Sequence, residues 1–159
     1  MSPNLSSLLM MLEAAERERD DARAELEAVR QGLEGAERQA QSLHDWRRDY
    51  QNRWQSQFRQ SGGMEIMRCY QDFMQRLGTA VQDQDVKVDQ ARAQMERSQA
   101  ALLERERKVA AITQLMERRQ SEWQRQQDRQ EQKATDELAA RLHRTQNWAG
   151  DTSGPPTVS

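Results

Sequence analysis

The sequence predicts an all-α protein, an antiparallel two-helix coiled-coil hairpin with a longer, overhanging second helix. Only 23 of the 159 residues are Leu, Ile, Val or Phe, which is too few for a compact globular core. Apolar residues recur at heptad spacing in two long stretches. A single Gly-Gly pair separates the two stretches. An ordinary globular enzyme is therefore not expected.

The charge balance argues against a disordered chain. Lys and Arg number 24 and Asp and Glu number 26, so the formal net charge is only -2, whereas disorder through charge repulsion needs a large net charge. Ala, Glu, Arg, Leu and Gln dominate the composition, and all five are strong helix formers. Pro3, Pro155 and Pro156 lie at the two ends, so about 150 consecutive residues are compatible with a helical backbone.

The same composition bears on compartment and partners. The longest apolar run, residues 8–12, is too short to span a bilayer, and the first dozen residues lack the basic start of a secretory signal. We therefore expect a cytoplasmic protein. The single Cys69 permits no intramolecular disulfide. The near-neutral charge indicates neither nucleic acid nor anionic lipid as a partner.

The first predicted helix covers residues from about 5 to 60. With Leu5 at heptad position a, thirteen of the sixteen a and d sites are apolar, which indicates a coiled coil. The a sites, followed by the d sites, are Leu5, Leu12, Arg19, Leu26, Leu33, Ala40, Arg47 and Trp54, then Leu8, Ala15, Ala22, Val29, Ala36, Leu43, Tyr50 and Gln57.

A turn is predicted at residues 61–63, Ser-Gly-Gly, and a second helix from about 64 to 148. All nine a sites of this helix are apolar, and its d sites are weaker. These sites are Met67, Met74, Val81, Val88, Met95, Leu102, Val109, Met116 and Trp123, then Tyr70, Leu77, Gln84, Ala91, Ser98, Arg105, Ile112 and Arg119. Residues 5–148 thus form one hairpin, and residues 149–159 are expected to be a disordered tail.

A turn centred on Gly62 brings together residues whose numbers add up to about 124, and antiparallel coiled coils pair a with d. The predicted layers are Trp54 with Tyr70, Tyr50 with Met74, Leu43 with Val81, Ala36 with Val88, Val29 with Met95, Ala22 with Leu102, Ala15 with Val109, and Leu12 with Ile112. One layer fits badly, because Arg19 opposes Arg105. We expect both guanidinium groups to extend outward toward nearby glutamates.

The second helix is longer, about 130 Å against about 80 Å, and must overhang the first. The regular seam lapses after residues 119–123, where the first helix ends as a partner. Ala134, Leu138 and Leu142 then restore a thin apolar stripe. This stripe indicates either a binding face for another molecule or a frayed, solvated helix end.

The apolar surface beside the turn is wider than a two-helix seam requires. Position g carries Trp46, Ile66, Phe73 and Ala80. One flank is formed by the g residues Trp46, Phe73 and Ala80 together with Leu43, Tyr50 and Leu77. Exposed aromatic patches often mark binding sites, although large g residues can also simply thicken the core.

Catalytic constellations are not found in the sequence. It has no glycine-rich phosphate loop and no metal-spaced cysteines, and His44 and His143 are far apart. Both histidines are expected at the surface, and Cys69 is expected to be a partly buried structural thiol. We predict a non-enzymatic protein with no cofactor, no metal and no small-molecule substrate.

Three segments together resemble the FliJ family of the bacterial flagellar type III export apparatus. They are residues 43–52 (LHDWRRDYQN), 68–77 (RCYQDFMQRL) and 131–141 (EQKATDELAAR), and the similarity extends from about residue 5 to 144. The aromatic spacing beside the turn and the QKxxDE run are the specific parts, because heptad periodicity does not demand them.

The resemblance implies a coiled-coil stalk that occupies the centre of the hexameric export ATPase ring, contacts the cytoplasmic part of the export gate membrane protein and helps to escort export chaperones. It also implies a cytoplasmic protein held at the inner face of the cell membrane through the export apparatus. The implied gate contacts are Gln39, Leu43, Trp46, Tyr50, Phe73, Leu77, Ala80 and Gln84. The implied ring contacts are Trp123, Gln132, Lys133, Asp136, Glu137, Leu138 and Arg141.

Other functions stay open at this point. One is the equivalent stalk of a virulence type III secretion system, and another is a generic dimeric coiled-coil tether without an ATPase partner. Nucleic-acid binding through the arginines near the turn is disfavoured. Straightening of the turn would also permit a swapped dimer, in which each helix finds the same seam in a second chain.

Overall fold

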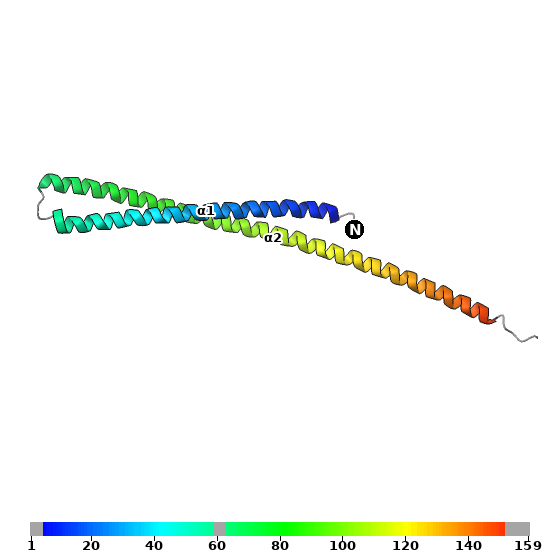
Figure 1. Cartoon of the computed structure of the whole chain (residues 1–159). Coiled ribbons are helices and arrows are strands. Elements are labelled where there is room, and N and C mark those ends of the chain that lie inside the picture. The colour runs from blue at the N-terminus through cyan, green and yellow to red at the C-terminus, as the bar shows by residue number, and fades with distance from the viewer. Residues whose placement is uncertain (1–4, 59–62, 152–159) are drawn as a thin grey trace, which may run out of the picture. The chain divides into compact units, whose positions relative to one another are not determined.

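The computed structural model describes residues 5–58 and 63–151, and it is helical throughout these ranges except at Gly63. Helix α1 spans Leu5–Arg53, a short π-helix η1 spans Trp54–Phe58, and helix α2 spans Met64–Asp151 (Figure 1). The two long helices pack against each other and run in opposite directions (Figure 1). The predicted all-α hairpin with a longer second helix is therefore confirmed.

A hydrogen bond marks the start of α2. The backbone carbonyl of Gly63 accepts a hydrogen bond from the amide of Met67 at 3.3 Å, which is the first hydrogen bond of α2. Residues 61 and 62 of the predicted turn lie outside the described residues, as do residues 152–159 of the predicted tail. Helix α2 continues through Gly150 to Asp151, beyond the predicted end at residue 148.

The chain forms two compact units, and each is described by itself. One unit is Glu13–Val109, and the other combines Met1–Leu12 with Ala110–Ser159. In both units every buried residue lies at a predicted a or d site. The buried residues are Leu5, Leu8, Ala15, Leu33 and Ala40 on α1, and Leu77, Val81, Gln84, Val88, Ser98 and Ile112 on α2. The heptad seam is thus the core of the protein.

The middle of the seam in Glu13–Val109 shows the predicted layering. Leu33, Ala40 and Val88 form a buried apolar cluster, against which Ala36, Ala91 and Met95 pack. The cluster thus combines alanines and larger apolar residues from both helices, so the two backbones approach without leaving voids.

Side-chain pairs across the same unit report the register. Glu37 accepts a hydrogen bond from Arg92 at 3.4 Å, and a carboxylate oxygen of Asp85 lies 3.1 Å from Nε2 of His44. Arg105 donates to Glu18 at 3.2 Å. In each pair the residue numbers add up to within about five of 124, as antiparallel pairing around the turn requires.

The predicted Arg19–Arg105 layer resolves largely as expected. Arg105 and Lys108 both reach the carboxylate of Glu18, whereas Arg19 turns to its neighbour Asp20 at 3.1 Å. Both guanidinium groups thus leave the seam for acidic partners, and only the identity of the partner of Arg19, an aspartate instead of a glutamate, differs from the prediction.

In the second unit, the start of α1 packs against α2 and the rest of α2 has no buried side chain. Leu5, Leu8 and Ile112 are buried. From residue 128 to residue 150 every side chain is exposed. No helix in the described ranges has an apolar stretch long enough to cross a membrane.

Candidate binding surfaces

Two pairs of aromatic rings beside the turn connect α1 and η1 to α2. Trp54, the first residue of η1, stacks on Tyr70 with ring centroids 4.2 Å apart and planes inclined by 10°. One helical turn away, Tyr50 packs on Phe73 with centroids 4.6 Å apart and planes inclined by 39°. Four rings from both helices therefore extend the seam outward at this end.

The Tyr50–Phe73 pair borders two hollows. One has a volume of about 210 Å³ and is lined by Tyr50, Trp54, Ile66, Cys69, Tyr70 and Phe73. The other has a volume of about 370 Å³ and is lined by Trp46, Asp49, Tyr50, Arg53 and Phe73. The first is almost wholly apolar, and the second offers charged groups next to an exposed tryptophan.

Some of the implied gate contacts share one hollow in the structure, whereas others are buried in the seam. Trp46, Tyr50 and Phe73 share one hollow, and they are 59%, 41% and 41% exposed. Gln39 is exposed, and Leu43 and Ala80 are half-buried. Leu77 and Gln84 lie in the seam at 7% and 6% exposure. The accessible part of this set is thus its aromatic members with Gln39.

Gln84 has a defined partner inside the protein. Its side-chain Nε2 donates a hydrogen bond to the backbone carbonyl of Ala36 at 3.1 Å. The amide therefore connects α2 to the backbone of α1 and does not point to solvent.

Several residues of this end did not stand out as site residues in the sequence. Trp54 and Tyr70 were expected to face each other, but only as a layer of the core. Cys69 was expected to be partly buried and is exposed. It occupies heptad position c, which points away from the partner helix. The π-helix η1 has no sequence signal of its own, since its residues continue the heptad pattern of α1.

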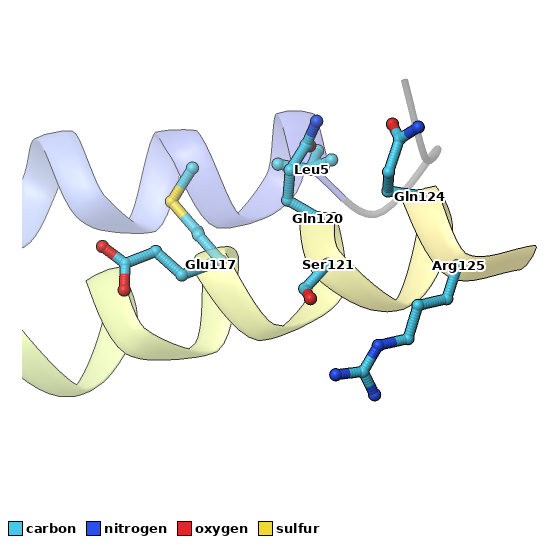
Figure 2. Close-up of a pocket in the computed structure, with 7 residues that line it drawn as sticks. Leu5, Glu117, Gln120, Ser121, Gln124 and Arg125 are labelled. Atoms are coloured by element: carbon cyan, nitrogen blue, oxygen red, sulfur yellow. The ribbon is translucent and has the colours of Figure 1, made fainter. Parts of the chain in front are cut away.

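A second surface lies where α1 begins. A hollow of about 560 Å³ is lined by Leu5 and by six residues of α2, namely Met116, Glu117, Gln120, Ser121, Gln124 and Arg125. Figure 2 shows Leu5 above Gln120 and Ser121, with Gln124 and Arg125 farther along α2. Leu9, Met10 and Met11 are exposed on α1 in the same unit.

The implied ring contacts lie along α2 in this unit. Trp123 is half-buried, and the other six, Gln132, Lys133, Asp136, Glu137, Leu138 and Arg141, are exposed. The predicted apolar stripe is present, because Leu138 and Leu142 are 60% and 59% exposed. Trp148, at 79% exposure, adds an aromatic side chain that the sequence did not single out.

The polar side chains of the described residues bond to one or two neighbours, in arrangements that do not suit a metal ion. His44 is half-buried between Asp85 and Arg47, and Nε2 of His143 lies 3.4 Å from the amide nitrogen of Asn147. Within residues 5–58 and 63–151 no group of three or more His, Cys, Asp or Glu side chains is placed to hold a metal ion.

Two long helices joined through a heptad seam, with aromatic rings clustered at one end, define a helical coiled-coil protein. The family model described as "Flagellar FliJ protein" matches residues 4–147. The chain therefore belongs to the FliJ family and is a protein related to flagellar export. Searches of curated proteins and of solved structures give no match.

Proposed function

We propose that this protein is the coiled-coil stalk of the flagellar export apparatus. In this proposal it inserts into the hexameric export ATPase ring, contacts the cytoplasmic part of the export gate and helps to escort export chaperones. Such a protein would be cytoplasmic and would associate with the membrane only through the apparatus. Membership of the FliJ family supports the proposal at the level of export.

The observation that carries the ring contact is the exposure of α2 from residue 128 to residue 150. Leu138 and Leu142 lie one helical turn apart on this stretch and are both more than half exposed. Exposed leucines at this spacing form an apolar stripe that a partner can cover. Lys133, Asp136, Glu137 and Arg141 supply charges of both signs around the stripe.

The gate contact is supported by the aromatic hollow beside the turn. Trp46, Tyr50 and Phe73 are exposed around it, and Asp49 and Arg53 form its polar edge. Protein interfaces concentrate their binding energy in such partly preformed aromatic sites with a polar rim. Tyr50 and Phe73 are already packed against each other, so little ordering is needed when a partner binds.

The ring contact is tested by ATP hydrolysis. Purified export ATPase is assayed at concentrations where it forms its ring, with and without this protein, and with a truncation that ends at Arg119. We expect the full chain to stimulate hydrolysis and the truncated chain to lose the stimulation.

A double variant tests whether stimulation needs the apolar stripe itself or only the full length of α2. Leu138→Ser with Leu142→Ser should reduce the stimulation, whereas Gln130→Ala, an exposed polar position on the same helix, should leave it intact. An ATPase that does not respond to the full chain would instead favour a tether that has no ATPase partner. In that case the mass in solution becomes informative, because a dimeric tether must have twice the mass of the hairpin.

A further inference from the structure

Gln84 is an unusual residue in the seam. It and Ser98 are the two buried polar residues of the described chain. The Nε2 group of Gln84 donates to the carbonyl of Ala36, which lies on the other helix. Pairs of side chains also connect α1 and α2. These pairs lie on the flanks of the seam, and at least one partner in each is substantially exposed.

The carbonyl oxygen of Ala36 is accessible because the side chains of α1 are small at this point. Ala36 occupies a d site and carries only a methyl group, and Gly35 precedes it. One heptad away in either direction, the d residues of α1 are Val29 and Leu43. Larger side chains at these sites would shield the backbone carbonyls, so a hairpin that slid by one heptad would leave the Gln84 amide without this acceptor.

The apolar seam and the exposed ion pairs discriminate weakly between registers. A slide of one heptad restores the a and d pattern, so the apolar seam by itself tolerates it. The ion pairs on the flanks are exposed, as in Glu37–Arg92 with side chains 44% and 60% exposed, and exposed pairs contribute little to stability. A buried hydrogen bond that forms in one alignment only is a stronger selector.

We propose that Gln84 is a positioning residue that fixes the register of α1 against α2. Through this register it aligns Tyr50 with Phe73 and Trp54 with Tyr70, and its own side chain does not touch a partner. The register-fixing role of Gln84 rests on its hydrogen bond to Ala36 and on the small side chain at that d site. Its consequence for gate binding rests on the function proposed above.

Distance measurement between two spin labels tests the register directly. Nitroxides are placed on Gln31→Cys and Gln75→Cys in a Cys69→Ser background, and both positions are exposed in Glu13–Val109. With facing residues adding up to 124, the labels are offset along the helix axis by about 27 Å, and a slide of one heptad changes this offset by about 10 Å. Dilution with unlabelled protein removes distances between chains.

The decisive variant is Gln84→Met, which keeps the length of the side chain and removes the donor. We expect helicity to persist and a second distance population, shifted by about 10 Å, to appear. The matched control is Ser98→Ala, which also removes a buried polar group from a d site and should keep the single native distance. A Gln84→Met chain with the native distance alone, or one that loses its helices, would overturn the proposal, as would an equal shift in the control.

A binding measurement then separates this inference from the proposed function. The purified cytoplasmic part of the export gate is titrated with the wild type and with Gln84→Met. Affinity should fall roughly in proportion to the slipped population. If the wild type does not bind the gate, the gate role fails while the distance result still decides the role of Gln84. If Gln84→Met shows the native register and yet binds more weakly, Gln84 contacts the gate directly and the inference is wrong.

Discussion

Trp54 and Tyr70 stack almost face to face, with their ring planes only 10° apart, and so join η1 to the second turn of α2. The stack places two large side chains where the two helices meet the turn. Aromatic pairs of this geometry add a stabilising term beyond the area that they bury.

This stack should appear as a coupling energy. In a double-mutant cycle of Trp54→Ala and Tyr70→Ala, measured by urea unfolding, we expect a coupling of about 0.5–1.5 kcal/mol. A control cycle that combines Trp54→Ala with Leu33→Ala, at a distant layer of the same seam, should be additive. Additive losses in the first cycle would mean that the rings are merely adjacent.

Replacement of Arg19 and Arg105 should raise the free energy of unfolding. Both residues occupy core sites but direct their guanidinium groups to Asp20 and Glu18. Replacing both arginines by leucine should raise the free energy of unfolding by about 1–3 kcal/mol, because apolar surface is then buried in the seam.

The control for that change is Arg17→Leu, at an exposed position outside the seam, which should alter the free energy of unfolding by less than about 0.5 kcal/mol. A double leucine variant that is no more stable than the wild type would show that the exposed ion pairs at this layer contribute more than expected.

Core and surface leucines should differ sharply. Leu33 belongs to the buried cluster with Ala40 and Val88, so Leu33→Ala should lower the free energy of unfolding by about 2–5 kcal/mol. Leu142 is 59% exposed, and Leu142→Ala should change it by less than about 0.5 kcal/mol. Chemical denaturation followed by circular dichroism measures both. Equal losses would contradict the placement of the core.

The aromatic flank should separate folding from binding. Trp46→Ala with Phe73→Ala removes two exposed side chains from one hollow. We expect the helical signal to stay nearly constant and the affinity for the cytoplasmic part of the export gate to fall at least tenfold, since aromatic anchors dominate interfaces. Trp148→Ala, which removes an exposed tryptophan from the other unit, is the control and should bind normally. Parallel losses of helicity and binding would assign the two residues to the core.

Much of the fold follows from periodicity, because a seam of two helices is a repeating structure. The buried residues fall on the predicted a and d sites, and the Trp54–Tyr70 layer forms as expected. The hydrogen bond of the Gln84 side chain could not be predicted from periodicity, since heptad position shows only that a side chain faces the seam. Whether its amide finds a backbone carbonyl depends on how closely Ala36 allows the helices to approach.

Two local features of the backbone could not be predicted from the heptad pattern either. The π-helix at Trp54–Phe58 widens one turn by a single residue, and the heptad sequence is compatible with either form. Helix α2 continues through Gly150, because a glycine lowers helix stability without forbidding the helix. Periodicity alone does not indicate the family of the protein. The aromatic spacing and the QKxxDE run do indicate it.

The exposed stretch of α2 has a consequence for the thermodynamics of any partner that binds it. From residue 128 to residue 150 the helix has no buried side chain. Its side-chain hydrogen bonds are local, as from the Thr135 hydroxyl to the backbone carbonyl of Glu131 at 2.8 Å. In proteins most of the stability of a helix comes from tertiary packing, which this stretch lacks. A partner that recognises this stretch as a helix must therefore bear the free energy of ordering it. Its affinity is then set in part by the helix propensity of residues that it never touches.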